Sequence, residues 1–484
     1  MLPRLLFLCV AFYGQFSQAQ ERSAYFGDLH VHTSFSFDAF QFGTRTTPDD
    51  AYNFASGKNI KHPSGEDMKL DTPLDFFSVT DHAAYLGFLK SLLEQDNPLF
   101  DESYVKELVD TGTVKQRGTY LAGSNDYAEQ HMRPEIAASA WQEIISAAER
   151  HNNPGTLTTF IGYEYTPSRE GGNLHRNVIF KSKKVPQEIF SRLDSANPED
   201  LWTWMDEVRA QGIESLSIPH NSNGSDGWMF QMEQFDGTKF DSNYAEKRMR
   251  NEPLVEITQV KGTSETHPFL SPDDDWAGFE IFPYRIAQFA KSRPQGSYVR
   301  EALKNGVALN SMRGFNPYQF GFVGASDTHN SGFTFDEEFF SGKVGIWDFY
   351  PKSRGSVPIG KYESAPTYRE TYRRYYSSSG LTGVWAEKNT RASIYSAFAR
   401  KETFATSGPR IRIRLFAGNN FSKDSHLDQK REKLGYERGV SMGGKLEGRS
   451  DNLSFIAMAT QDPKGIPLQR LQMIKGWVEN GVPQ

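Results

Sequence analysis

The sequence predicts an α/β fold in which strands alternate with helices around a closed or nearly closed barrel. Short β-like runs alternate with helical patterns over residues 25–402, which is typical of parallel βαβ units. Several of these strands are almost continuously apolar, as expected when both faces of a sheet are covered. Polar groups gather at the end of strand after strand, where a βα barrel keeps its active site. A doubly wound open sheet is the alternative, but the sequence contains no glycine-rich nucleotide loop.

The expected elements follow one another with few breaks. Strands are expected at 25–32, 74–82, 157–165, 175–180, 214–220, 253–258 and 321–329. Helices are expected at 48–56, 135–151, 201–211, 297–306 and 391–402, because the apolar positions there recur at helical spacing. Three long segments interrupt this series, at 83–134, 222–252 and 330–380. Loops of this length often serve as lids or specificity elements.

The two ends of the chain differ from this central pattern. Residues 1–19 combine Arg4, a short apolar run and small residues before a cleavage point, as in a secretory signal peptide. The single cysteine, Cys9, lies inside this segment, so the mature chain is expected to have no disulfide. Residues 20–407 then form the barrel. Residues 408–484 are expected to form a β-rich segment that includes an extended stretch at 468–478 and is incomplete at its end.

Composition limits the classes of function. Hydrophobic residues make up 37% of the 484-residue chain, and the net charge is −6. A sizeable core is therefore expected, and without a basic run no nucleic-acid partner is expected. No other stretch approaches the roughly 18 apolar residues of a membrane span, so none is expected in the mature chain. Export without disulfides indicates a periplasmic or secreted protein, and the oligomeric state is left open.

Side chains that bind metals recur at the expected strand ends. Residues 27–40 read GDLHVHTSFSFDAF, and alternate residues of a strand point to the same face, so Asp28, His30 and His32 are expected to share one side. Six of the eleven histidines and five carboxylates occupy such positions: His30, His32, His82, His175, His220, His329, Asp28, Asp38, Asp81, Glu164 and Asp327.

Each element alone has an ordinary structural explanation. TDH and DTH turns can simply cap the next helix, and single histidines are often core residues. The occurrence of such histidines and carboxylates at five separate strand ends instead indicates a metal site. Imidazoles and carboxylates without thiolates suit zinc, manganese or iron, and so many candidates predict two or three divalent ions.

These motifs resemble a known family. DLHVHTSFSFD, SVTDH, a Glu after an apolar strand, SIPHN and GASDTHN are similar to the ordered motifs of the PHP (polymerase and histidinol phosphatase) superfamily. The beginning of the chain resembles an uncharacterised secreted branch of that superfamily, known as a domain of unknown function. The resemblance implies a distorted (βα)7 barrel over residues 25–409 with a trinuclear metal site.

The resemblance also implies a ligand set. The first ion would be held by His30, His32, Glu164 and Asp327, and the second would share Glu164 and add His175 and His220. The third would be held by Asp38, His82 and His329. Asp28 and Asp81 would orient the neighbouring histidines.

These expectations together predict a secreted hydrolase of a small anionic ester, and specifically a phosphoesterase. Close ions would activate a bridging hydroxide and neutralise the ester, with Glu164 as the bridge and Asp327 as the base. Arg45, Arg169 and Arg176 are candidates for binding the substrate anion. The alternatives are a sulfate or phosphonate ester hydrolase, an amidohydrolase, and a metal-stabilised binding module without activity. An amidohydrolase is less favoured, because such enzymes usually have a ligand lysine or an extra aspartate, and no lysine is expected at a strand end here.

Overall fold

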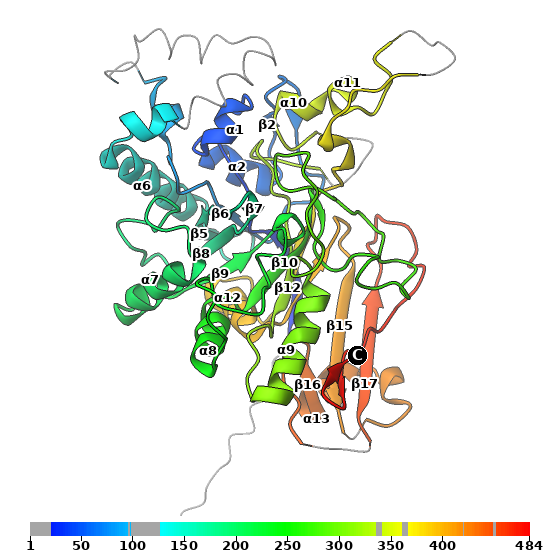
Figure 1. Ribbon diagram of the computed structural model, residues 1–484. Helices are drawn as coiled ribbons and strands as arrows, with labels where there is room; N and C mark the ends of the chain where they lie inside the picture. Colours follow the sequence, from blue (N-terminus) through cyan, green and yellow to red (C-terminus); the bar gives the residue numbers. More distant parts are fainter. Residues whose placement is uncertain are drawn as a thin grey trace, which may run out of the picture.

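A curled seven-stranded sheet forms the centre of the molecule (Figure 1). The structure, a computed structural model, describes residues 21–94, 97, 126–334, 341–360, 366–419, 421–448 and 452–484. The strands of the sheet stand in the order β14-β13-β1-β4-β5-β8-β9. Their bounds are β1 (Ser23–Asp28), β4 (Phe76–Val79), β5 (Thr158–Tyr165), β8 (Arg176–Phe180), β9 (Ser215–Pro219), β13 (Leu381–Ala386) and β14 (Thr403–Thr406).

The strand directions correct the prediction of uniform parallel βαβ units. β1, β4 and β5 are parallel. β8 is antiparallel to both β5 and β9, and β13 is antiparallel to both β1 and β14. Parallel neighbours need a long crossover, usually a helix, whereas antiparallel neighbours can be joined by a short connection. Between β5 and β8 the chain makes only the small hairpin β6 (Ser168–Arg169) and β7 (Gly172–Asn173), so it returns in the opposite direction.

A small second sheet lies against both edges of the large one. It has the order β11-β10-β12, with β10 (Leu254–Gln259) parallel to β12 (Gly321–Gly324) and antiparallel to β11 (Gly262–Thr263). β10 packs beside β9, and β12 packs beside β13 and β14. The chain is therefore a mixed α/β protein with a curled half-barrel sheet, and a continuous (βα)7 barrel is not seen in the described residues.

Helices cover the outside of the sheet, and their sequences explain where they begin. The larger helices are α2 (Pro48–Ala55), α6 (Pro134–His151), α7 (Pro198–Ala210), α8 (Ser242–Asn251), α9 (Val299–Arg313) and α12 (Arg391–Arg400). Thr47 and Asp50 form a capping box at the start of α2, which satisfies two backbone donors. Trp141, Ile144 and Ala148 of α6 are buried, at the spacing of one helix face. All five helices expected from the sequence are present.

Shorter elements connect these parts. The short helices are α1 (Phe37–Gln41), α3 (Phe88–Ser91), α10 (Ile346–Phe349), α11 (Pro351–Arg354), η1 (Ser222–Gly224), η3 (Tyr372–Tyr375) and η4 (Ser425–Leu427). A two-stranded hairpin pairs β2 (Ile60–Lys61) with β3 (Asp67–Met68). The predicted signal peptide at 1–19 lies outside the described residues.

The C-terminal segment forms a separate small sheet, seen in orange and red in Figure 1. β15 (Arg412–Gly418) pairs antiparallel with β16 (Gly439–Ser441) and β17 (Ser454–Thr460), and α13 (Arg431–Arg438) packs on β15 and β16. No strand forms at 468–477, where an extended stretch was expected; only the short pair β18 (Val478–Glu479) and β19 (Val482–Pro483) follows. In the described residues no helix is both long and apolar enough to cross a membrane.

Candidate metal centre

His30 and His32 enter the site directly after β1. Leu29 and Val31, which alternate with these histidines, are buried in the apolar cores, so the predicted alternation is observed. The backbone of this segment is fixed on both sides, because the Thr80 amide donates to the Val31 carbonyl and the His32 amide donates to the Thr328 carbonyl. Both imidazoles are fully buried, and their ring centroids lie 5.3 Å apart.

Glu164, near the end of β5, is the centre of the cluster. One of its carboxylate oxygens, Oε2, lies 3.1 Å from His30 Nε2 and 3.2 Å from His32 Nε2. The other, Oε1, lies 2.8 to 3.6 Å from ring nitrogens of His82, His175 and His220. A carboxylate that is 1% exposed therefore faces five imidazoles.

His175 reaches Glu164 by a route that the predicted parallel sheet does not provide. It stands just before β8, which runs antiparallel to β5, with Arg176 opposite Tyr165. The beginning of β8 therefore lies at the same edge of the sheet as the end of β5. The His220 amide donates to the His175 carbonyl, which places both imidazoles on the same side of Glu164.

Asp38 joins His82 and His329 in a second part of the cluster. Asp38 stands in the first turn of α1, and its Oδ2 lies 2.9 Å from His329 Nε2 and 3.3 Å from His82 Nε2. The rings of His32 and His329 approach to 4.0 Å between centroids. The side chains of Asp38 and His175, 21% and 19% exposed, are more open to solvent than their partners and mark the mouth of the site.

Asp327 is a second carboxylate that faces His30 and His32. Its Oδ1 lies 3.3 Å from His30 Nε2 and 3.5 Å from His32 Nε2. Asp327 also contacts two buried lysines, because Lys343 Nζ donates to Oδ1 at 2.6 Å and Lys261 Nζ donates to Oδ2. The backbone of Asp327 is left-handed, with φ of 51°, a conformation that is costly for a residue other than glycine and typical of functional sites.

Three groups of these residues bring ligand atoms within 4.8 Å of one another. They are His32 with His82 and His329, His30 with Glu164 and His220, and His30 with His32 and Asp327. All nine predicted metal ligands therefore lie in one cluster and contact at least one other member.

Asp81 holds His32 through a serine. Ser36 Oγ donates to Asp81 Oδ1 at 2.7 Å, and so accepts the proton of His32 Nδ1 across 2.9 Å. His32 Nε2 is the ring nitrogen left facing the site, and this buried atom has no hydrogen-bond partner among the described residues. It faces one carboxylate oxygen of Glu164 and one of Asp327. An imidazole nitrogen and two carboxylate oxygens that converge in a buried place are a suitable donor set for a cation.

Asp28 acts on the backbone rather than on an imidazole. Its carboxylate accepts from the His30 amide at 3.0 Å and from the Ser326 amide at 3.2 Å. It therefore joins the segment after β1 to the segment after β12. Burial raises the pKa of Asp28 to about 7, which is consistent with its distance from compensating cations.

Electrostatics divides the histidines of the cluster into two kinds. Burial alone would lower the pKa of His30 and of His82, but nearby carboxylates outweigh it and raise each pKa to about 10. Burial dominates at His175 and His329 and lowers each pKa to about 3. Burial would raise the pKa of Glu164, yet the surrounding histidines hold it well below its usual range. The cluster thus holds charged carboxylates beside the neutral imidazoles of His175 and His329, whereas His30 and His82 would exchange a proton for a cation.

Three residues of the site were not predicted. Glu256 Oε2 on β10 lies 2.9 Å from His30 Nδ1, an arrangement that orients a metal-binding histidine; the only signal was an acid within an apolar strand. Lys261 follows β10 by two residues, so the expectation that no lysine lies at a strand end was wrong. Lys343 lies in a loop, and burial lowers its pKa to about 8.

The three predicted substrate arginines contact other parts of the protein. Arg176 is buried and donates to Glu252 at 2.8 Å. Arg169 lies over the rings of Trp228 and Phe235. Arg45 is exposed, lies over the Phe40 ring and donates to the Phe40 carbonyl. Contacts between these arginines and the cluster are not seen in the described residues.

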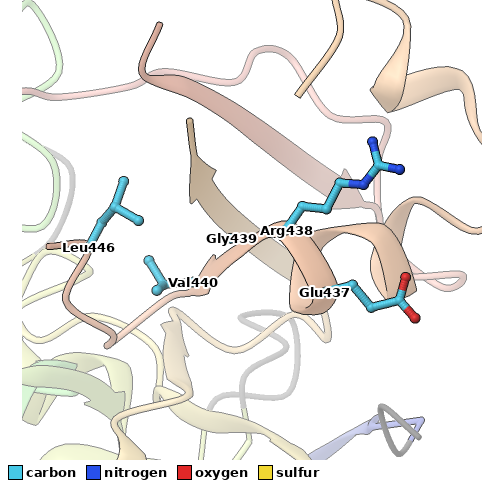
Figure 2. Close-up of a pocket in the computed structure, with 5 residues that line it drawn as sticks. All are labelled: Glu437, Arg438, Gly439, Val440 and Leu446. Atoms are coloured by element: carbon cyan, nitrogen blue, oxygen red, sulfur yellow. The ribbon is translucent and has the colours of Figure 1, made fainter. Parts of the chain in front are cut away.

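The C-terminal segment contains a hollow whose lining residues differ from those of the cluster. It has a volume of about 640 Å³ and is lined by Glu437, Arg438, Gly439, Val440 and Leu446 (Figure 2). In Figure 2 the charged ends of Glu437 and Arg438 point away from Val440 and Leu446. An active site needs polar groups that converge, so the buried cluster is the better candidate.

Comparison with known families matches residues 19–484 to the family described as a protein of unknown function (DUF3604). The chain belongs to this family. No curated protein matches it. Among solved structures, this DUF3604 chain is similar to a two-domain protein from Bacteroides vulgatus, described as containing a predicted PHP-like metal-dependent phosphoesterase. The two share 14% identity over 92% of this chain and 88% of that one, with a TM-score of 0.32, which is too low to carry an argument about fold or function.

Proposed function

We propose that this DUF3604 protein is a metal-dependent hydrolase of small anionic esters, and specifically a phosphoesterase. The observation that supports it best is the meeting of His32 Nε2, Glu164 Oε2 and Asp327 Oδ1. The histidine nitrogen lies 3.2 Å from the Glu164 oxygen and 3.5 Å from the Asp327 oxygen, and it makes no hydrogen bond among the described residues. A divalent ion bound by these three atoms would satisfy the buried nitrogen and both carboxylates.

The residues of the cluster fit two or three such ions. His30, His32, Glu164 and Asp327 would hold the first, Glu164 with His175 and His220 the second, and Asp38 with His82 and His329 the third. The absence of thiolates suits zinc, manganese or iron. Bound divalent ions would supply positive charge to the ester and lower the pKa of a bound water.

The side chains of the protein have distinct tasks in this proposal. Glu164 holds the imidazoles at fixed distances, and Glu256 and Ser36 fix the rings of His30 and His32, respectively. Asp38 and His175 lie where the substrate enters. Burial would raise the pKa of Asp327, but His30 and the two lysines hold it well below its usual range, so its carboxylate stays charged beside the candidate ligands.

The PHP resemblance supports the same proposal at a finer level. The segments that carry its motifs come together at one edge of the curled sheet. We propose that the large and small sheets together correspond to a distorted (βα)7 barrel of that type. We also propose that residues 1–19 direct export to the periplasm or the exterior.

A substrate panel with controlled metal tests the proposal. Protein stripped with chelator and reloaded with zinc, manganese or iron is given p-nitrophenyl phosphate, bis-p-nitrophenyl phosphate, p-nitrophenyl sulfate and a p-nitroanilide. We expect turnover of a phosphate ester that needs added metal. Preferred turnover of the sulfate or the anilide would identify a different hydrolase. A protein that binds metal but turns over none of a broad ester and amide panel would indicate a binding module.

A further inference from the structure

Two lysines share the carboxylate of Asp327. Lys261 Nζ contacts Oδ2 and Lys343 Nζ contacts Oδ1, and the lysines are 7% and 3% exposed. Buried ammonium groups are costly unless they are paired. One carboxylate carries a single negative charge, so this trio has one surplus positive charge at the edge of the cluster.

Lys343 is surrounded by groups of the protein. An ammonium group has three donors. Lys343 Nζ contacts Oδ1 of Asp327 at 2.6 Å and the Asp327 carbonyl oxygen, and it lies 2.9 Å from His329 Nδ1. Asp327 uses two of its donors, and the third faces His329. Lys343 is therefore suited to holding Asp327 and His329 in place.

Lys261 is different, because its ammonium has one hydrogen-bond acceptor among the described residues, the Asp327 carboxylate. Two of its donors therefore have no acceptor among the described residues. This arrangement is asymmetric: the two lysines meet the same carboxylate, but Lys343 has three neighbouring protein groups and Lys261 has one.

The protein fixes the backbone of Lys261 firmly. Lys261 lies in the turn between β10 and β11, where Gln259 pairs with Gly262. Its amide donates to Gln259 Oε1, Gln259 donates to Glu256, and Glu256 contacts His30. Asn223 Nδ2 donates to the Lys261 carbonyl at 3.0 Å. The turn is therefore linked by hydrogen bonds to a candidate metal ligand.

We propose that Lys261 binds the anionic group of the substrate, a phosphate-like oxyanion, while Lys343 is a positioning residue. This inference rests on the proposed function, since it places the ester group beside the metal ligands. The surplus charge and the two available donors match an oxyanion, which accepts strong hydrogen bonds from ammonium groups. Of the cations described near the cluster, Lys261 thus replaces the predicted arginines as substrate-binding residue.

The test compares Lys261→Met with Lys343→Met, since each removes one ammonium group from the same carboxylate and leaves the other. Binding of inorganic phosphate to the manganese-loaded proteins is measured by titration calorimetry, and manganese content by mass spectrometry. We expect Lys261→Met to raise the Kd for phosphate about 10- to 100-fold, as for loss of a charged hydrogen bond, with unchanged metal content. Lys343→Met should instead mainly weaken manganese binding.

The other outcomes separate the anion site from the hydrolase. An unchanged Kd for phosphate in Lys261→Met, or equal increases in both variants, would show that Lys261 has no specific role in anion binding. Lys261→Gln is used if the Met variant does not fold, and failure of both by thermal melting would make Lys261 a structural residue. Lys261-dependent phosphate binding without ester turnover would refute the hydrolase but keep the anion site, and turnover without such dependence would do the reverse.

Discussion

The cluster has two halves built around two carboxylates, and their partners differ in kind. Glu164 faces imidazoles on both oxygens. Asp327 faces two of the same imidazoles on Oδ1, but each of its oxygens also accepts from a lysine. Imidazoles can lose a proton near neutral pH and then bind a cation, whereas lysines normally remain charged. The Glu164 half is therefore suited to binding metal ions. In the Asp327 half, the carboxylate would be shared between a metal ion and two lysines that remain charged.

The largest effect is expected from replacing Glu164, the carboxylate that faces imidazoles on both of its oxygens. Glu164→Gln should lose at least one metal ion per chain and reduce turnover below detection, because the amide cannot serve both groups of histidines. Asp327→Asn should keep the ions that Glu164 holds and lose less metal. Mass spectrometry of the purified variants measures this. A fully metallated and active Glu164→Gln protein would contradict the bridging role.

A smaller effect is expected from pH on the metal-free protein. His30 and His82 have pKa values raised to about 10 against about 6.5 when unfolded. The stability that they contribute is complete below about pH 6.5 and is lost as pH rises through about 10. Burial lowers the pKa of Lys343 to about 8, so its contribution to stability increases as pH rises. This is one group, and it opposes the two histidines. Thermal melting in chelator should therefore show falling stability from pH 7 to pH 10.

Metal should remove this alkaline loss, because an ion bound to His30 and His82 replaces their protons. The same melts after manganese loading serve as the control. Equal alkaline loss with and without manganese would show that these histidines do not exchange protons for metal.

The smallest effect is expected in the support of His32. Ser36→Ala removes the hydroxyl between Asp81 and His32, and should cost about 1 kcal/mol of stability and on the order of tenfold in metal affinity. Ser34→Ala is the matched control, since Ser34 Oγ is buried without a hydrogen-bond partner in the described residues. Unfolding in urea and metal titration measure both. Equal effects in the two variants would exclude the orienting role of Ser36.

The positions of the candidate ligands could be predicted because they depend on short local patterns. Val31 packs in the core between His30 and His32, and the TDH and DTH turns follow buried strands, so strand alternation alone places their side chains. His175 was predicted to be a ligand, but as the first residue of its expected strand it had no place at the C-terminal edge of a parallel sheet. Its true position depends on the short connection after β5, whose length decides the direction of β8.

The rest of the site depends on contacts between distant segments. Glu256 is 226 residues from His30, and its strand belongs to a different sheet. Lys343 is 16 residues from Asp327, and the sequence between them has no helical or strand pattern. Arg176 was selected as a positive side chain near a strand end, but adjacent residues in a strand face opposite sides, and its side chain contacts Glu252.

That opposition between His175 and Arg176 has a consequence for the sequence changes that the site can tolerate. A one-residue deletion in the hairpin before β8 would shift its register and exchange the faces of the whole strand. The guanidinium would then turn toward the site, the imidazole would leave it, and the buried Glu252 would lose its partner. The Arg176–Glu252 ion pair thus opposes such a shift, and we expect this hairpin to accept changes of residue more readily than changes of length.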